Sequence, residues 1–221
     1  MDLSHLNPSQ RAAVLCIDGP LLVLAGAGSG KTRVITHRMQ NLIGLGVPPD
    51  RIVGVTFTNK AAGEMRERAE SLLSGRANSR GLTVTTFHSL CARLLRRYAE
   101  AARLKPDYAI YDTSDQLAVV KRAVADAGLS SGNWSPRSVL SAISNAKNEL
   151  QDADAYEANA GDFYARTIAK IYRAYEHALR KAGAVDFDDL LLMTVKALKS
   201  DAAARGECQA RWRWLMIDEY Q

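Results

Sequence analysis

A glycine-rich stretch near the N-terminus constrains the fold of this chain more than any other feature. It follows the apolar run of residues 21–24 and precedes apolar residues at helical spacing over residues 34–42. This order predicts a strand, a tight glycine loop and a helix in direct succession. The stretch itself consists of Ala25, Gly26, Ala27, Gly28, Ser29, Gly30, Lys31 and Thr32.

A glycine loop between a strand and a helix is typical of a phosphate-binding site. Successive backbone N–H groups and the positive end of the helix dipole must converge on one phosphate, which bulky side chains would block. Lys31 would then reach the β- and γ-phosphates of ATP, and the Thr32 hydroxyl would help to hold Mg²⁺. The usual pattern has glycine where Ala25 stands, which is a small change at a strand end. The alternative is a glycine-rich turn with a solvated lysine.

A pair of carboxylates, Asp218 and Glu219, follows the apolar residues 214–217. A buried parallel strand delivers its last residues to the carboxyl edge of a sheet, where nucleotides bind in open α/β folds. Asp218 would contact Mg²⁺, through water, and Glu219 would orient and deprotonate the attacking water. Acidic pairs at strand ends are common, but with the glycine loop upstream this pair is the expected second half of a phosphate-cleaving site.

Composition limits the class of protein. No apolar run approaches the roughly 20 residues that a membrane helix requires, and the N-terminus lacks the charge and the apolar core of a signal peptide. We therefore expect a soluble, cytoplasmic protein with no membrane partner. The net charge of +5 permits nucleic-acid binding without demonstrating it. The three cysteines have no C-x-x-C spacing, so neither a disulfide framework nor a zinc site is indicated.

Two regimes of sequence pattern divide the chain. Residues 1–88 alternate between strand and helix patterns, which predicts an α/β domain with a parallel sheet flanked by helices. Residues 89–186 show helical signals, so we expect an inserted all-helical subdomain. Residues 187–221 are expected to return to the sheet domain and to end at the acidic strand, leaving that domain truncated at its C-terminal end. The strands expected before residue 90 lie at residues 21–24, 51–57 and 82–87.

The helical block has its own start signals. A helix is expected from Thr113, where the spacing of a capping box occurs, and another from Pro136 after an N-cap serine. Aromatic and aliphatic residues recur at helical spacing over residues 164–179, which is more typical of a core than of a base-stacking surface. The arginines of residues 93–97 are either phosphate contacts or a solvated helix face.

Several segments together resemble superfamily 1 DNA helicases of the UvrD/Rep/PcrA type, nearest the Rep-like branch. The resemblance covers the whole chain, and the order and spacing of the segments fit. In that family the phosphate-binding motif itself has alanine where Ala25 stands. The segments are the Q motif at residues 6–10, motif I at 25–32, motif Ia at 55–62, the next DNA-contacting motif at 85–88, the segment that leads back to the sheet domain at 185–191, and motif II at 217–221.

This resemblance implies a RecA-like domain and assigns roles to further residues. Gln10 would read adenine through an amide that both donates and accepts, and Arg33 and Gln221 would also contact the nucleotide. Single-stranded DNA would lie against an aromatic face, small polar groups and a helix N-terminus. The implied DNA contacts are Phe57, Thr58, Asn59, Lys60, Thr86 and His88.

The residues alone leave other interpretations open for three of these positions. Gln10 could be an exposed glutamine at a helix start, and Phe57 could be a core residue. His88 could be a structural histidine with satisfied hydrogen bonds.

The resemblance implies the N-terminal part of an ATP-dependent 3′-to-5′ DNA helicase that acts on single-stranded DNA and DNA junctions in repair or replication. We expect the fragment to bind Mg-ATP weakly without useful hydrolysis or unwinding, because the arginines that complete such sites belong to later motifs. Two alternatives stay open: an ATP-gated DNA-binding module without motor activity, and the motor half of a helicase-nuclease.

Overall fold

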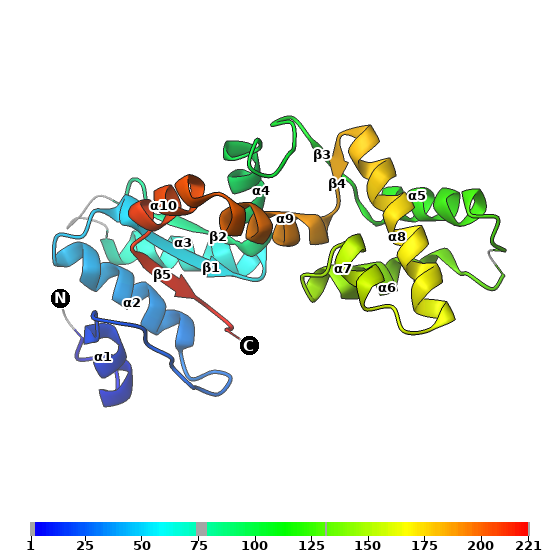
Figure 1. The fold of residues 1–221 in the computed structure, drawn as a ribbon. Helices are drawn as coiled ribbons and strands as arrows, with labels where there is room; N and C mark the ends of the chain where they lie inside the picture. Colours follow the sequence, from blue (N-terminus) through cyan, green and yellow to red (C-terminus); the bar gives the residue numbers. More distant parts are fainter. Residues whose placement is uncertain (1–2, 74–78, 131, 221) are drawn as a thin grey trace. The chain divides into compact units, whose positions relative to one another are not determined.

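The computed structural model describes residues 3–73, 79–130 and 132–220. Its internal contacts divide the chain into two compact units (Figure 1). The first, which we call the sheet unit, combines Met1–Leu90 with Gly206–Gln221. The second, the helical unit, is Cys91–Arg205. No helix in the described ranges is long and apolar enough to cross a membrane.

A parallel three-stranded sheet forms the centre of the sheet unit. Its strands are β1 (Ile52–Thr56), β2 (Thr83–Thr86) and β5 (Trp214–Ile217), in the order β2-β1-β5. Every residue of β1 is buried, as expected for a central parallel strand covered on both faces. The predicted α/β class, with a parallel sheet flanked by helices, is confirmed.

Helices α2 (Lys31–Gly44) and α3 (Asn59–Leu73) pack on this sheet, with α1 (Pro8–Leu15) against α2. Met39 of α2 and Met65 of α3 join Ile52 in one buried core. A Cβ atom at Gly54 would lie 2.3 Å from Met39 Cε and 3.2 Å from Met65 Sδ, so a larger residue at this strand position would require the two methionine side chains to shift. A short 3₁₀ turn, η1 (Pro49–Arg51), leads into β1.

The strand expected at residues 21–24 is not formed, so that prediction is wrong. The segment has no strand pairing in the structure, and its side chains are exposed, Leu24 to 87%. An apolar run becomes a strand only where a neighbouring strand accepts its hydrogen bonds. Among the described residues, β1 lies between β2 and β5, and neither outer strand pairs with residues 21–24.

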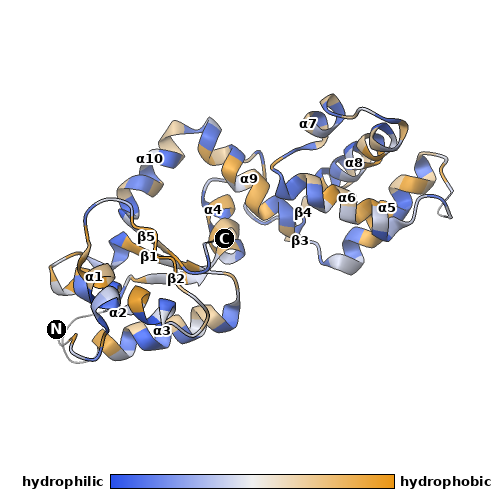
Figure 2. Ribbon diagram, turned by 90° about the horizontal axis from the view of Figure 1, so that it is seen from below, coloured by the Kyte–Doolittle hydropathy of each residue, from blue (hydrophilic) through white to orange (hydrophobic). Residues whose placement is uncertain are grey.

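Most of the helical unit consists of amphipathic helices, whose hydrophilic and apolar bands alternate in Figure 2. A pair of two-residue parallel strands, β3 (Ala109–Ile110) and β4 (Ala184–Val185), was not anticipated from the sequence. The sequence pattern places the return to the sheet domain at residue 187. In the structure the helical unit runs to Arg205 and includes helix α9 (Phe187–Ser200). The helices are α4 (Phe87–Arg97), α5 (Thr113–Asp126), α6 (Pro136–Asn148), α7 (Ala153–Ala158), α8 (Phe163–Ala182), α9 (Phe187–Ser200) and α10 (Ala202–Arg211); α4 begins in the sheet unit and α10 ends there.

The aromatic stripe of α8 lies mainly in the core, as predicted. Tyr172 and Tyr175 are fully buried among α5, α6 and α8. Tyr164, at the start of the stripe, is half exposed and stacks on Trp134. Helix α5 begins at Thr113, as expected, but its capping residue is Asp112, which accepts the N–H groups of Ser114 and Asp115.

One buried cation joins three helices of the helical unit. Lys147 of α6 has a fully buried side chain, and its Nζ lies 2.7 Å from Asp186 Oδ2, 2.6 Å from Asp189 Oδ1 and 2.7 Å from Glu176 Oε1. Asp186 caps α9 and also accepts the Tyr175 hydroxyl. Burial alone would lower the pKa of Lys147, but the three carboxylates outweigh burial and raise it, so the lysine is charged.

We predict that Lys147→Met destabilises the chain by about 3–5 kcal/mol, because the buried Asp186 and Asp189 and the partly buried Glu176 would lose the cation that they share. Urea unfolding followed by circular dichroism measures the change. Lys170→Met, at an exposed position on α8, is the matched control and should change stability by less than about 0.5 kcal/mol. Equal midpoints for the two variants would show that the Lys147 cluster contributes no net stability.

Candidate nucleotide site

The glycine loop ends at a helix N-terminus, as the sequence predicts. Gly28 and Gly30 have φ of 75° and 86°, a left-handed conformation that residues with a Cβ rarely adopt. Gly30 is the N-cap of α2, and Lys31 and Thr32 are its first residues. The first N–H groups of α2 therefore point from the helix toward the loop, where they can receive an anion.

The two predicted half-sites meet in space. Thr32 Oγ1 donates a hydrogen bond to Asp218 Oδ2 at 3.1 Å, although the residues are 186 positions apart. Lys31 Nζ lies 3.8 Å from Glu219 Oε1 and donates to the carbonyls of Ala25 and Gly26. The structure thus brings the lysine, the hydroxyl and both carboxylates together at one end of β5.

The pairing of β5 with β1 determines where the acidic pair, Asp218 and Glu219, lies along the sheet. The Asp218 N–H donates to Val55 O at 2.9 Å, which continues the ladder one step beyond the strand. Glu219 then takes a φ of 59°, which is uncommon for a residue other than glycine and costs backbone energy. This turn ends the strand at the carboxyl edge and leaves the Glu219 side chain half exposed, at 45%.

The donor set fits a hard divalent cation. Asp218 is only 5% exposed, and its Oδ1 is buried without a hydrogen bond from any residue in the described part of the chain. A buried carboxylate oxygen without a partner is costly. Mg²⁺ takes oxygen ligands and commonly uses one or two protein groups, with water and phosphate oxygens for the rest. Thr32 and Asp218 supply such groups.

Gln10 lies against the glycine loop. Its Nε2 donates to Ser29 O at 2.9 Å, and its Oε1 accepts the Asn7 N–H in a capping box of α1. Gly30 has a φ of 86°, which strains any residue with a Cβ, and a Cβ there would lie 3.0 Å from Gln10 Nε2, so the glutamine amide would have to shift slightly. Gln10 is therefore more than an exposed residue at a helix start, because it joins α1 to the loop.

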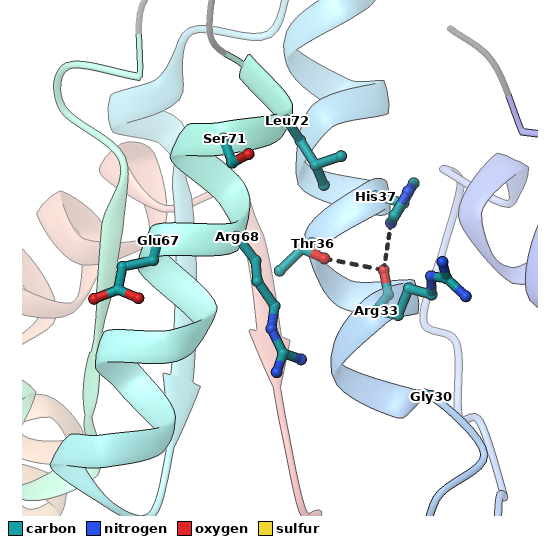
Figure 3. Close-up of a pocket in the computed structure, with 8 residues that line it drawn as sticks. All are labelled: Gly30, Arg33, Thr36, His37, Glu67, Arg68, Ser71 and Leu72. Carbon is teal, nitrogen blue, oxygen red and sulfur yellow. Dashed lines mark hydrogen bonds between the residues drawn. The ribbon is translucent and has the colours of Figure 1, made fainter.

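Arg33 is exposed on the first turn of α2, next to a pocket of about 590 Å³ between α2 and α3. Figure 3 shows its side chain pointing away from α3, and its carbonyl accepts from Thr36 and from the His37 ring. The other ring nitrogen of His37 lies 2.8 Å from His5, and burial lowers the pKa of His37. The pocket lining consists of Gly30, Arg33, Thr36, His37, Glu67, Arg68, Ser71 and Leu72.

Neither the pair of histidines nor the α3 side of this pocket was expected from the sequence. No local pattern marks them, because His5 and His37 meet only through the packing of the N-terminal segment on α2. Gln221, an expected nucleotide contact, lies outside the described residues.

The expected DNA contacts lie at the carboxyl ends of β1 and β2. Phe57 is 59% exposed and packs against Phe87, with ring centroids 5.6 Å apart, so the alternative of a core phenylalanine is wrong. Thr58, Asn59 and Lys60 are exposed at the start of α3. Thr86 is buried and caps the start of α4 through Ser89, and His88 is partly buried beside it.

Comparison with known proteins gives consistent matches. A family model described as the UvrD/REP helicase N-terminal domain matches residues 6–221. The chain is 44% identical over 217 residues to the ATP-dependent DNA helicase PcrA of Leuconostoc citreum, covering 98% of the chain and 29% of the relative. It is 42% identical over 220 residues to the PcrA of Bacillus subtilis, covering 99% of the chain and 30% of the relative. The chain thus spans about three tenths of the length of these relatives.

We predict that Gly30→Ala destabilises the sheet unit by about 1–3 kcal/mol, because a Cβ strains the left-handed backbone and presses on Gln10. Thermal or urea unfolding measures the loss. Gly63→Ala is the matched control, since Gly63 lies in α3 with nothing within 4 Å of the added Cβ, and alanine should be neutral or stabilising there. A Gly30→Ala chain as stable as Gly63→Ala would contradict the assignment of this tight contact.

Proposed function

Because the chain belongs to the UvrD/REP helicase family, we propose that it forms the ATP-binding part of a 3′-to-5′ DNA helicase that moves on single-stranded DNA in the cytoplasm, in repair or replication. The observation that carries the proposal is the 3.1 Å contact between Thr32 and Asp218. That contact unites a phosphate-binding loop with an acidic strand end. The direction of movement and action at DNA junctions rest on the family resemblance.

Each residue of the site has a distinct task in this proposal. The N–H groups at the start of α2 receive the β-phosphate, and Lys31 exchanges its loop carbonyls for the β- and γ-phosphate oxygens. Thr32 and Asp218 would hold Mg²⁺, which neutralises charge on the phosphates when bound. Glu219, the more exposed of the two carboxylates, orients the attacking water and accepts its proton.

Adenine and DNA would occupy neighbouring parts of the sheet unit. The Gln10 amide can exchange either of its hydrogen-bond partners for the adenine edge. Arg33 lies exposed, one residue beyond Thr32. Single-stranded DNA would stack a base on the exposed ring of Phe57, with a phosphate at the N-terminus of α3. ATP binding and DNA binding would thus both use residues at the carboxyl edge of the same sheet.

We further propose that the 221-residue chain alone hydrolyses ATP slowly. Phosphoryl transfer needs positive charge on the γ-phosphate beyond one lysine, and arginine fingers contribute about 10³ to 10⁵ in rate. In the helicase family that the chain resembles, those arginines belong to later motifs.

Lys31→Ala should weaken binding of a fluorescent ATP analogue at least about tenfold in the presence of Mg²⁺, because the loop loses the cation that meets the phosphates. Lys199→Ala, at an exposed position on α9, serves as the control and should bind like the original chain. The proposed site would be refuted if the affinity for the nucleotide were the same in both variants and the original chain, with and without Mg²⁺.

Phe57→Ala should weaken binding of a fluorescent dT oligomer by about 1–3 kcal/mol, the usual contribution of one base stacked on an aromatic ring. Phe163→Ala is the matched control, because Phe163 is also solvent-facing, at 78% exposed, but lies at the start of α8. Equal losses in the two variants would rule out a specific base contact at Phe57.

A further inference from the structure

Two side chains of α2 hold the C-terminal half of α1. Arg38 Nη1 donates to Ala13 O at 2.8 Å. Asn41 Nδ2 donates to Val14 O at 3.1 Å. Both bonds lie beyond Gln10, which is in the first turn of α1. The start of α1, where Gln10 lies, is fixed to α2 by a different contact.

That contact is a pair of histidine rings. His5, two residues before the N-cap of α1, has its Nε2 2.8 Å from His37 Nε2, and the ring centroids are 4.9 Å apart. His37 is on the second turn of α2 and is 5% exposed. Its other ring nitrogen, Nδ1, lies 2.8 Å from Arg33 O. The pair thus joins the chain before Gln10 to the first turn of α2, which follows the glycine loop.

The surroundings of His37 determine which of its nitrogens carries the proton. A carbonyl oxygen only accepts, so the Nδ1 that faces Arg33 O must be the N–H nitrogen. Neutral His37 then has an unprotonated Nε2, which accepts the Nε2–H of His5. A His5 ring that takes up a second proton, at Nδ1, still donates from Nε2 and keeps the contact. A protonated His37 cannot keep it, because its Nε2–H would face another N–H at 2.8 Å.

Burial and charge both disfavour protonation of His37. Burial is the main cause that lowers its pKa, and the charges of His5 and Arg33 lower it further, against the bond to the Arg33 carbonyl. Glu67, which lines the pocket beside His37, points away from α2 (Figure 3). The charged side chains of α1, α2 and α3 that line this pocket or bond to the N-terminal segment are Arg11, Arg33, Arg38, Glu67 and Arg68.

The contact between the two histidines therefore depends on pH. It needs a neutral His37, so it is complete above the ordinary histidine pKa of about 6.5. It is lost as the pH falls through the lower pKa of His37 in the folded chain.

Gln10 is the residue of this segment that meets the proposed nucleotide site. Its Nε2 donates to Ser29 O at 2.9 Å, and the α1 cap that its Oε1 completes lies two residues after His5. Loss of the contact with His37 would free the start of α1 and with it Gln10. Lys31 would stay at the start of α2, after the glycine loop. The base and phosphate halves of the site are thus attached to the sheet unit separately.

We propose that His5 and His37 are positioning residues that hold Gln10 at the adenine edge, so that base selection weakens at low pH independently of the phosphate contacts. This inference rests on the proposed function and deepens it, because it identifies what controls the base half of that site. The phosphate half uses Lys31 and backbone N–H groups of the loop and of α2, which do not depend on the histidine pair.

The test compares ATP with inosine triphosphate (ITP), in which an oxygen replaces the 6-amino group that the Gln10 oxygen would accept from. Affinities of the 221-residue chain are measured by competition with a fluorescent ATP analogue in Mg²⁺. The pH runs from about 8 to about 5.5, on both sides of the ordinary histidine pKa. Titration of the triphosphate affects both nucleotides equally, so the ratio of the ITP to the ATP dissociation constant reports on the base alone. Circular dichroism at each pH confirms that the chain is folded.

Three variants accompany the original chain. His37→Gln replaces the imidazole by an amide, which donates and accepts hydrogen bonds without taking up a proton. Gln10→Ala removes the base contact itself. His177→Gln is the matched control, because His177 is exposed on α8 in the helical unit.

In the original chain and in His177→Gln, the ratio should fall by about three- to tenfold from the highest to the lowest pH, which is the contribution of one hydrogen bond. The ratio should be the same at every pH in His37→Gln, and both low and constant in Gln10→Ala. A pH dependence that persists in either of these two variants would overturn the inference. Equal losses of ATP and ITP affinity in the original chain at low pH would overturn it as well.

Two further outcomes separate this inference from the proposed function. A chain that binds ATP and ITP equally at every pH would overturn the inference and leave the proposed phosphate site standing. A folded chain that binds neither nucleotide would overturn both.

Discussion

The hydrogen-bond ladder between β1 and β5 is the interaction on which the candidate site depends. It pairs Val53 with Leu215 and continues to the bond between Val55 and Asp218. Because all three strands are parallel, their carboxyl ends meet at one edge of the sheet. The backbone pairing alone therefore places the residues proposed to bind nucleotide near those proposed to bind DNA. A slip of one residue in β5 would turn Asp218 to the other face.

The helical unit uses a different principle, which is a buried cation shared by several carboxylates. Lys147 contacts α8 through Glu176 and α9 through Asp186 and Asp189. Asp186 and Asp189 also cap α9, whose N-terminal dipole favours negative charge. Excess negative charge around Lys147 is thus compensated by a helix end and by the Tyr175 hydroxyl.

Much of the sheet unit could be predicted from the sequence because its signals are local. The glycine loop, the helix after it and the acidic strand end each follow from neighbouring residues. The failures concern pairing over long distances. Residues 21–24 have the composition of a strand but pair with no strand in the described part of the chain, and β3 and β4 are too short to have a pattern of their own. No sequence pattern identified Lys147 as a buried cation, because its three carboxylate partners lie on other helices. The exposure of Phe57 and the left-handed backbone of Glu219 likewise follow from tertiary structure.

The short pairing of β3 with β4 has a consequence for the order of folding. Pairing of β1 with β5 joins residues about 160 positions apart, a contact that is slow to form in an unfolded chain. The β3–β4 pair brings Ile110 beside Val185, and the contacts that stabilise it lie within the helical unit. Once that unit has formed, the loop left for the sheet to close is about half as long, which lowers its entropic cost by about 0.6 kcal/mol. The helical insertion therefore interrupts the sheet domain in sequence. Because its two ends meet, it adds little to the entropic cost of pairing β1 with β5.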